Sequence, residues 1–277
     1  MAIKSKPAKF KEDTDHMLQR LFFCLGMAGV IAAPALWADN IAWEVTSTSQ
    51  FGTMDLNTGV FTLIGSQTAQ LSGLGVLSGT LYGGASVGNT LYSVNTTTGA
   101  LTSIGTGSIT YVDFGSTLTG LYAIGLDSSL YSINAATGAA TLIGATGLNI
   151  AQKTIGLSTN SSTLYYSWGG KLYTLNTATG APTLLGTTGV DDNGALVLEG
   201  GSLWGGTNFP LSVGTINTST ASESTVATVS GTSSLFFGLA PGPVQMSGTP
   251  EPSTWLLLAS SLGALRCLRR SRRRPQQ

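Results

Sequence analysis

The side chains that could do chemistry in this chain of 277 residues are few, and most of them are carboxylates. Serine is abundant, but a nucleophilic serine needs a base, and the only histidine, His16, lies near the N-terminus. The two cysteines, Cys24 and Cys267, lie in terminal apolar segments, so neither Cys nor His is available for metal or haem in the middle of the chain. We therefore predict no catalytic triad, no metal site and no cofactor.

Paired carboxylates are the chemistry that remains, because cleavage of a glycosidic bond needs only two, roughly 5 to 10 Å apart. Asp113 and Glu199 are the main candidates, and Asp127 is a further one. Asp113 stands where three similar segments have small residues, namely Gly73, Gly156 and Ala195. A lone acid in such a series is typical of a local hydrogen-bonding variation. We therefore predict a protein that is not an enzyme and keep Asp113 and Glu199 as candidate ligand residues.

One acidic segment resembles part of a calcium-binding loop. Asp191-Asp192-Asn193-Gly194 offers the oxygen ligands that calcium prefers, but it lacks the spaced ligands and bidentate Glu of the full motif. A surface turn is the better interpretation of this segment.

The distribution of charge excludes one large class of partner. The 13 Lys and Arg equal the 13 Asp and Glu in number, yet residues 41–249 contain only two cations, Lys153 and Lys171, against eight anions. Binding of nucleic acid needs clustered Lys and Arg to neutralise phosphates. We therefore predict no nucleic-acid partner for the middle of the chain.

The elements that position these residues repeat five times, and each repeat has the pattern of a β-hairpin. Two short runs of alternating apolar and Thr or Ser residues flank the turn Asn-x-x-Thr-Gly, in which Asn caps the turn and Gly takes a positive φ. The first residues of the five units are 40, 39, 42 and 41 positions apart. The capping positions are Asp55, Asn95, Asn134, Asn176 and Asn217.

Two further sets of residues recur once in every repeat, and we call them the aromatic ladder and the inner ladder. Aromatic residues precede each hairpin, and we expect them to pack between sheets, although a sugar-stacking platform is an alternative. These residues are Trp43, Tyr82, Tyr122, Tyr165 and Trp204. Short Gly-containing strands supply the other ladder, which comprises Leu74, Phe114, Leu157, Leu196 and Phe237.

Four strands in about 40 residues are the signature of a propeller blade. The first repeat lacks the short anchor strand, and the last anchor strand, 235–239, has no hairpin after it. We therefore predict an all-β fold in which residues 39–240 form a five-bladed β-propeller, with its first blade completed by the C-terminal strand. An open β-solenoid is the alternative, and it would require capping segments at its ends.

The N-terminal segment has the layout of a secretory signal. An apolar run from Leu21 to Ala35 follows Arg20 and ends in small residues. We predict a helical signal peptide over residues 1–38, with cleavage after Ala38. Because acidic residues dilute the positive charge of the first sixteen positions, Met17 is an alternative start.

The C-terminal segment has three parts. Residues 241–253 form a linker that contains Pro250, Glu251 and Pro252, and residues 254–277 form a short apolar helix with an Arg-rich cytoplasmic end. The apolar stretch of eleven residues spans roughly 17 Å, less than the hydrocarbon core of about 30 Å. The residues that would stop it in the membrane are Arg266, Arg269, Arg270, Arg272, Arg273 and Arg274.

This tail resembles the PEP-CTERM sorting signal of exported proteins from Gram-negative bacteria that produce exopolysaccharide. The same tail is also called an ice-binding protein C-terminal domain, a label that carries no evidence of antifreeze activity. The resemblance implies that Pro250, Glu251 and Pro252 are recognised by exosortase, a membrane-embedded sorting enzyme. It also implies that the helix and its arginines hold the chain at the membrane, although Arg266 shortens the apolar stretch.

Together these features predict an exported protein that faces the periplasm or the cell surface, or is released by cleavage near Pro250. We expect its propeller to act as a non-catalytic interaction module, with polysaccharide or protein as the ligand. A carboxylate-based glycan-cleaving enzyme is one alternative. A structural component of a biofilm or surface layer is the other.

Overall fold

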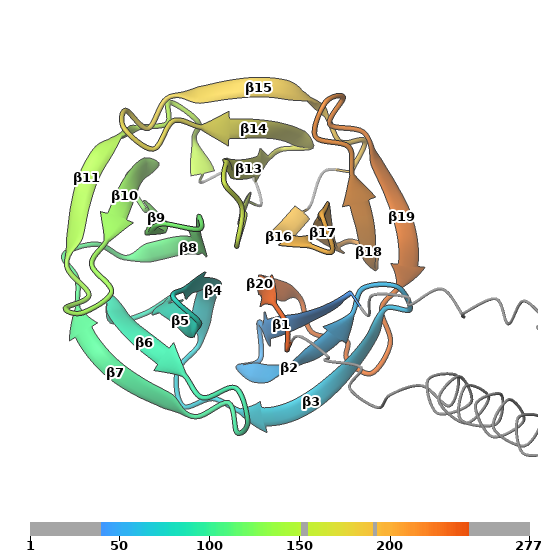
Figure 1. Ribbon diagram of the computed structural model, residues 1–277, viewed down its shortest axis with the longest axis horizontal. Coiled ribbons are helices and arrows are strands. Elements are labelled where there is room, and N and C mark those ends of the chain that lie inside the picture. Colours follow the sequence, from blue (N-terminus) through green and yellow to red (C-terminus); the bar gives the residue numbers. More distant parts are fainter. Residues whose placement is uncertain (1–39, 151–154, 191–192, 244–277) are drawn as a thin grey trace, which may run out of the picture. The chain divides into compact units, whose positions relative to one another are not determined.

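The computed structural model describes residues 40–150, 155–190 and 193–243, and this part of the chain is all-β. Twenty strands form five four-stranded antiparallel sheets, arranged as the blades of a closed ring (Figure 1). The prediction of a five-bladed propeller is therefore confirmed. The expected signal peptide and C-terminal helix lie outside the described residues.

Each blade runs from an inner strand, next to the central axis, to an outer strand at the rim. Blade 1 contains β20 (Phe236–Pro241), β1 (Ile41–Thr46), β2 (Gln50–Asp55) and β3 (Val60–Ser66). Blade 2 contains β4 (Leu71–Leu77), β5 (Thr80–Ala85), β6 (Thr90–Val94) and β7 (Leu101–Thr106). Blade 3 contains β8 (Tyr111–Ser116), β9 (Leu121–Gly125), β10 (Ser129–Ile133) and β11 (Ala140–Ala145). Blade 4 contains β12 (Ile155–Leu157), β13 (Leu164–Trp168), β14 (Lys171–Leu175) and β15 (Pro182–Thr187). Blade 5 contains β16 (Asn193–Glu199), β17 (Ser202–Asn208), β18 (Leu211–Ile216) and β19 (Glu223–Thr228).

The chain closes the ring by returning to its beginning. β20 pairs antiparallel with β1, with Trp43 opposite Ala240 and Glu44 opposite Leu239. This pairing confirms that the C-terminal strand completes blade 1, and it excludes the open solenoid. It also corrects one position of the inner ladder. The register places Leu239, not Phe237, at the level of Leu74, because seven residues connect β19 to β20 where four connect β3 to β4.

The predicted hairpins form the two outer strands of every blade, and the predicted turn capping is confirmed. The Asn95 carboxamide oxygen accepts the backbone N–H of Thr97 at 2.9 Å and that of Thr98 at 3.1 Å. Matching bonds occur at Asp55, Asn134, Asn176 and Asn217. Glycine takes the positive φ in four turns, whereas Ala221 takes it in blade 5, at 62°.

The glycine at the end of the hairpin repeat has a packing role that the sequence pattern did not reveal. A Cβ at Gly144 in β11 would collide with the backbone carbonyl of Thr179, in the turn of the next blade. Gly65, Gly105 and Gly186 meet the corresponding turns of the following blades in the same way. These glycines therefore let each outer strand contact its neighbour closely.

Five apolar clusters form the core, one between each pair of neighbouring blades. The aromatic ladder contributes one residue to each cluster, which confirms its predicted packing role. Trp43, for example, packs between blades 1 and 2 and stacks on Phe51 with ring centroids 5.3 Å apart. Trp204 lies in the cluster between blades 5 and 1, where the ring closes.

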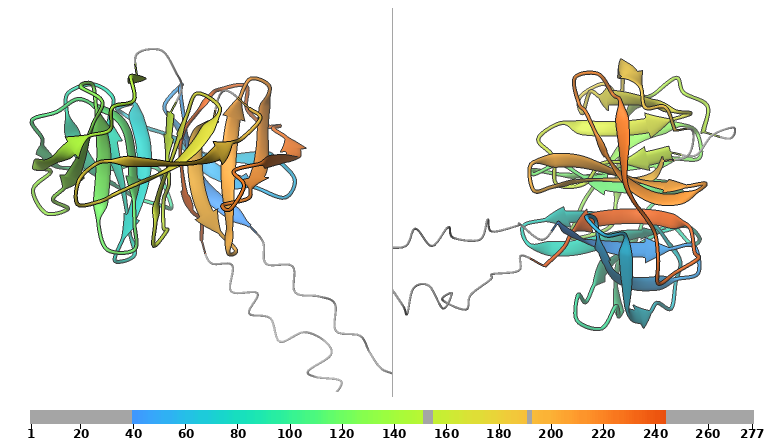
Figure 2. Two further views of the ribbon diagram at one scale, coloured as in Figure 1. Left: turned by 90° about the horizontal axis from the view of Figure 1, so that it is seen from above. Right: turned by 90° about the vertical axis from the view of Figure 1, so that its right-hand side faces the viewer.

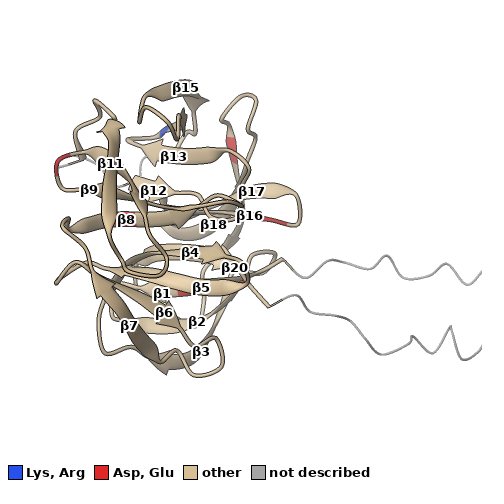
Figure 3. Cartoon of the chain, turned by 60° about the vertical axis from the view of Figure 1, so that its left-hand side comes forward, with Lys and Arg blue, Asp and Glu red and all other residues tan. Residues whose placement is uncertain are grey.

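The strands cross the thickness of the ring and give it two faces (Figure 2). We call the face on which the inner strands begin the upper face, and the face on which they end the lower face. Charged residues are few along the described part of the chain (Figure 3). Within residues 40–150, 155–190 and 193–243, no helix is long and apolar enough to cross a lipid bilayer.

Candidate functional site

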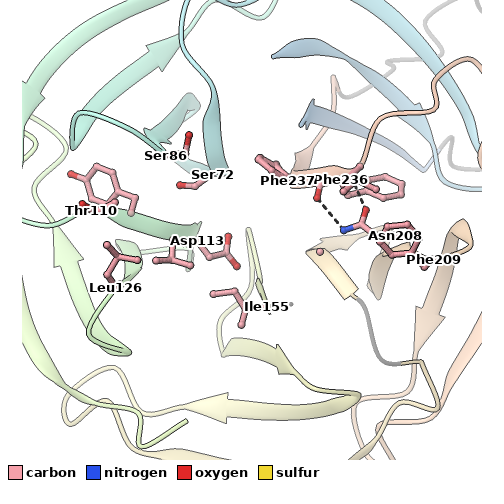
Figure 4. Close-up of a pocket in the computed structure, with 14 residues that line it drawn as sticks. Ser72, Ser86, Thr110, Asp113, Leu126, Ile155, Asn208, Phe209, Phe236 and Phe237 are labelled. Carbon is pink, nitrogen blue, oxygen red and sulfur yellow. Dashed lines mark hydrogen bonds between the residues drawn. The ribbon is translucent and has the colours of Figure 1, made fainter. Parts of the chain in front are cut away.

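A central cavity of about 440 Å³ opens on the upper face, and residues from all five blades line it (Figure 4). Its size falls within the range of about 300–1,000 Å³ that is usual for ligand sites. Its polar lining comes mainly from Ser72, Ser86, Thr110, Asp113 and Asn208. Its apolar lining comprises Tyr111, Val112, Leu126, Ile155, Phe209, Leu235, Phe236 and Phe237.

Small residues on the inner strands bring the blades together just below this cavity. A Cβ at Gly238 in β20 would lie 2.6 Å from the backbone nitrogen of Leu74, and one at Gly73 would lie 2.6 Å from that of Phe114. Such distances leave no room for a side chain. The small residues that the sequence repeats along the inner strands therefore set how closely the blades approach the axis.

Asp113 is the exception among these small residues, as the sequence indicated, and its side chain is 3% exposed at the cavity wall. Its Oδ1 accepts the backbone N–H of Phe114 at 2.7 Å, and its Oδ2 accepts that of Leu157, in blade 4, at 2.5 Å. Burial raises the pKa of Asp113 well above its usual range, and the two backbone bonds oppose this rise. Both oxygens are thus already engaged with the protein.

The apolar rim of the cavity comes from the loops that follow the second strand of two blades. Leu126, after β9, is 67% exposed, and Phe209, after β17, is 73% exposed. Both residues line the cavity, together with the half-buried Phe237 of β20. The sequence analysis missed this rim. Its signal is an apolar residue directly after a strand, at a position where a turn would ordinarily be polar.

Asn208 fixes the closing strand at the cavity wall. Its Oδ1 accepts the backbone N–H of Phe236 at 2.7 Å, and its Nδ2 donates to the Phe236 carbonyl at 3.4 Å (Figure 4). Asn208 belongs to blade 5 and Phe236 to β20 of blade 1. One side chain therefore joins blade 5 to the strand that completes blade 1.

Glu199, the second candidate ligand residue, lies far from this cavity. It ends β16 on the lower face, whereas Asp113 lies near the start of β8 on the upper face. Asp113 matches Ala195 in register, so four residues, roughly 13 Å of strand, separate the two levels. Burial raises the pKa of Glu199, and a bond from the Gly200 backbone opposes the rise. Asp113 and Glu199 do not share a cavity.

Asp127, the further candidate, is bound to its own blade. Its Oδ2 accepts the hydroxyl of Tyr131 at 2.8 Å, and its Oδ1 accepts the backbone N–H of Ser129 at 3.2 Å. Partial burial raises its pKa, but these hydrogen bonds together outweigh burial and lower it. Asp127 therefore acts as the cap of an exposed turn.

Sequence reasoning missed a buried acid on the opposite side of the ring. Glu44 in β1 is 0% exposed, and neither of its carboxyl oxygens has a hydrogen-bond partner among the described residues. It faces the same side of the strand as Ala42, toward the apolar cluster between blades 5 and 1. Burial raises the pKa of Glu44 well above its usual range, so the neutral form is favoured.

A buried polar network in blade 5 was also missed. Asn193 Nδ2 donates to Glu223 Oε2 at 2.8 Å, and Thr207 Oγ1 donates to Asn193 Oδ1 at 3.1 Å. Burial raises the pKa of Glu223, and the bonds from Asn193 and Thr207 oppose the rise. Blade 2 has Leu71, Ala85 and Leu101 at the corresponding positions of the register. The signal was therefore a set of polar residues at positions that are apolar in another repeat.

Several predicted positions fall outside the described residues, and the structure does not test them. They are Ala38, Asp191, Asp192, Pro250, Glu251, Pro252, Arg266, Arg269, Arg270, Arg272, Arg273 and Arg274. Within residues 40–150, 155–190 and 193–243, no three His, Cys, Asp or Glu side chains lie close enough together to hold a metal ion.

Comparison with known proteins gives a likeness in fold only. No family model matches the chain, and no curated protein matches it. Among solved structures, the chain is similar to one in the structure described as "Crystal structure of Nidogen/Laminin Complex". That likeness has 16% identity and a TM-score of 0.48, and it covers 73% of this chain and 80% of the other. No functional argument follows from a likeness of this size.

Proposed function

We propose that the chain is an exported protein whose propeller is a non-catalytic binding module, and that the central cavity takes an uncharged, largely apolar group of a protein partner. One observation carries the proposal. All five blades contribute to a cavity, and among the described residues that line it the one carboxyl group, that of Asp113, is already bound by two backbone N–H groups. The described lining thus offers a shaped, largely apolar surface on which no acid or base is free.

The chemistry of the lining supports an apolar ligand. Phe236, Phe237 and Tyr111 surround the cavity, and the exposed side chains of Leu126 and Phe209 extend its rim toward solvent. Exposed apolar side chains around a concave site are typical of surfaces that bind partners. An aromatic or aliphatic side chain inserted here would bury its surface against these residues, at about 25 cal/mol per Å² of apolar area.

The positions of the acids support a non-catalytic role. Cleavage of a glycosidic bond by two carboxylates requires them to be roughly 5 to 10 Å apart, on either side of the bond. Asp113 lies at the cavity on the upper face, whereas Glu199 lies at the end of β16 on the lower face. Among the described residues, a substrate in the cavity would therefore meet one carboxyl group, and that group is engaged with Phe114 and Leu157.

Selection from a random peptide library on the immobilised full-length chain tests this proposal. We expect the selected peptides to carry aromatic or aliphatic residues, and to lose binding to the variants Leu126→Asp and Phe209→Ser. Leu142→Asp is the matched control, because Leu142 is an exposed leucine on β11, away from the cavity. Peptides that bind both rim variants with the affinity that they have for the wild type would refute the site.

The proposed export and sorting depend on the two terminal segments. We infer that residues 1–38 direct export, with cleavage after Ala38. We further infer that Pro250, Glu251 and Pro252 are recognised by an exosortase-like enzyme while the helix and arginines of 254–277 hold the chain at the membrane. The tail motif supports this proposal, because motif, apolar stretch and arginines occur in that order. Deletion of 250–277 should change cell fractionation and processing, and unchanged fractionation would refute sorting.

A further inference from the structure

A second concave site lies on the lower face, between blades 4 and 5. It is a groove of about 740 Å³, lined by the turns that join strands of these two blades. Its lining residues are Ser161, Ser162, Tyr165, Leu198, Gly201, Ser202, Leu203, Thr215, Ile216, Asn217, Thr218, Ser219, Thr220, Ser222 and Ser224. No described residue lines both this groove and the central cavity, so a variant can alter one site and leave the lining of the other intact.

The groove exists here because two neighbouring turns differ in length. Six residues, 158–163, connect β12 to β13 in blade 4, whereas only Gly200 and Gly201 connect β16 to β17 in blade 5. Both glycines have positive φ, at 57° and 79°, which allows the tight turn. A long turn beside a short one leaves the groove between them.

The lining is polar but uncharged. No described residue that lines the groove is Asp, Glu, Lys or Arg. Several of its hydroxyl groups make no hydrogen bond with any described part of the protein, so they are available to a ligand. These hydroxyls belong to Ser162, Ser202, Thr215, Thr218, Ser219 and Ser224. A ligand that matches this surface must itself be neutral and rich in hydrogen-bonding groups.

Tyr165 adds an aromatic surface to the groove. It belongs to the aromatic ladder and packs partly against the cluster between blades 4 and 5, yet it also lines the groove. No other member of the ladder lines it. Tyrosine has an apolar ring and a polar hydroxyl, so it can pack against the C–H face of a sugar and bond to its hydroxyls.

We infer that this groove binds a segment of neutral polysaccharide, a chain of uncharged hexoses. Hydroxyl groups on the walls would exchange hydrogen bonds with those of the sugar, while Tyr165 packs against one ring. The absence of charge among the lining residues separates this ligand from an acidic polysaccharide, which would require cationic side chains. The inference goes beyond the proposed function, because it concerns the opposite face of the ring and a different ligand. The protein would then hold a polysaccharide on one face and a protein on the other.

Saturation-transfer NMR on the full-length chain tests the inference, with cellohexaose and maltohexaose as neutral probes and an alginate hexamer as the charged one. We expect at least one neutral probe to bind and the alginate not to bind. Tyr165→Ala should weaken binding about fivefold or more, and Tyr165→Phe should retain most of it. The double variant Ser202→Ala and Ser224→Ala, at two exposed positions, should weaken binding at least about twofold.

Two controls keep the result interpretable. Tyr122→Ala removes the matching ladder residue of blade 3, outside the groove, and should leave binding unchanged. Phe209→Ser alters the central cavity and should also leave binding of the neutral probe unchanged. A failure of the proposed function, which concerns the central cavity, can therefore be told apart from a failure of this inference. The inference is overturned if neither neutral probe binds, if alginate binds more tightly, or if Tyr165→Ala together with the serine double variant binds like the wild type.

Discussion

The carboxylate of Asp113 in blade 3 accepts the backbone N–H of Leu157 in blade 4, with 2.5 Å between Oδ2 and the nitrogen. At the corresponding level the other blades have Gly73, Gly156, Ala195 or Gly238, none of which can make such a bond. The acid that interrupts a series of small residues therefore joins two inner strands. Its chemistry is that of a structural hydrogen-bond acceptor.

Replacement of this acid should weaken the fold. In Asp113→Asn, the amide NH₂ would point at one of the two backbone N–H groups that the carboxylate now accepts. We expect the free energy of unfolding to fall by about 1–3 kcal/mol, as measured by urea denaturation. Glu199→Gln, at a half-buried position on the lower face, is the matched control and should change stability by less than about 0.5 kcal/mol. A variant Asp113→Asn as stable as the wild type would contradict this role.

The ring could be predicted from sequence because its signals are local and repeat. Each hairpin carries its own turn signal, such as Asn95 before Thr98 and Gly99, and these signals recur with the spacing of a blade. The closing strand followed from counting, since one strand lacked a blade and one blade lacked a strand. The register of that strand did not follow. Seven residues connect β19 to β20 where four connect β3 to β4, so Leu239 takes the position that spacing assigned to Phe237.

The sites could not be predicted because they depend on residues far apart in the chain. Ser72 and Asn208 both line the central cavity, and no local pattern in the sequence assigns these two residues to one site. The groove on the lower face depends on a difference in length between two turns. Glu44 occupies a strand position that alternation alone would allow to face solvent. Its burial follows only from the closure of blade 5 against blade 1.

Substitution by alanine should cost more stability at a glycine packed against the next blade than at a glycine in an open turn. Gly144→Ala would place a Cβ against the Thr179 carbonyl, and we expect the free energy of unfolding to fall by about 2 kcal/mol or more. Gly79→Ala is the matched control, because Gly79 has a positive φ of 78° but open space around its Cβ. Its cost should be close to about 1 kcal/mol, from backbone strain alone. Equal costs in urea denaturation would show that outer-strand packing is unimportant.

Glu44 should make stability depend on pH. Because burial raises the pKa of its folded state, the folded chain holds a proton that the unfolded chain releases above about pH 4.3. The stability present below that pH should therefore decline as the pH rises toward the folded pKa. Each pH unit in this window costs about 1.4 kcal/mol.

Removal of this carboxyl group should reverse the effect. Glu44→Met keeps a side chain of similar length and removes two polar atoms without partners. The methionine would face the apolar cluster that contains Met54 and Leu239. We expect stability at pH 7 to increase by about 1–3 kcal/mol, with a smaller gain at pH 4. Thermal unfolding of the wild type and the variant at a series of pH values between 4 and 8 measures the gain in stability at each pH. A gain of the same size at every pH would show that Glu44 does not carry the pH dependence.

Asn208 should control the closure of the ring. In Asn208→Ala, the backbone N–H of Phe236 loses its acceptor, which should cost about 1–3 kcal/mol. The loss should be local, so amide hydrogen exchange should accelerate first in β20 and in its partner β1. Amides of β9 and β10, in blade 3, serve as the internal control and should keep their protection. Uniform acceleration across all blades would contradict a local closure.

The polar network of blade 5 should behave as one unit. Asn193→Leu alone leaves the Glu223 carboxylate without its best donor, and we expect a loss of about 2 kcal/mol or more. Blade 2 offers an apolar alternative for the whole set, because Leu71, Ala85 and Leu101 occupy the matching positions.

Copying that set into blade 5 gives a variant with three substitutions, namely Asn193→Leu, Thr207→Ala and Glu223→Leu. Its stability should return to within about 1 kcal/mol of the wild type, since no buried polar side-chain atom of the network is left unpaired. Urea denaturation of the single and threefold variants measures the coupling. If the threefold variant loses the sum of the single losses, the residues act separately and blade 5 does not tolerate the packing of blade 2.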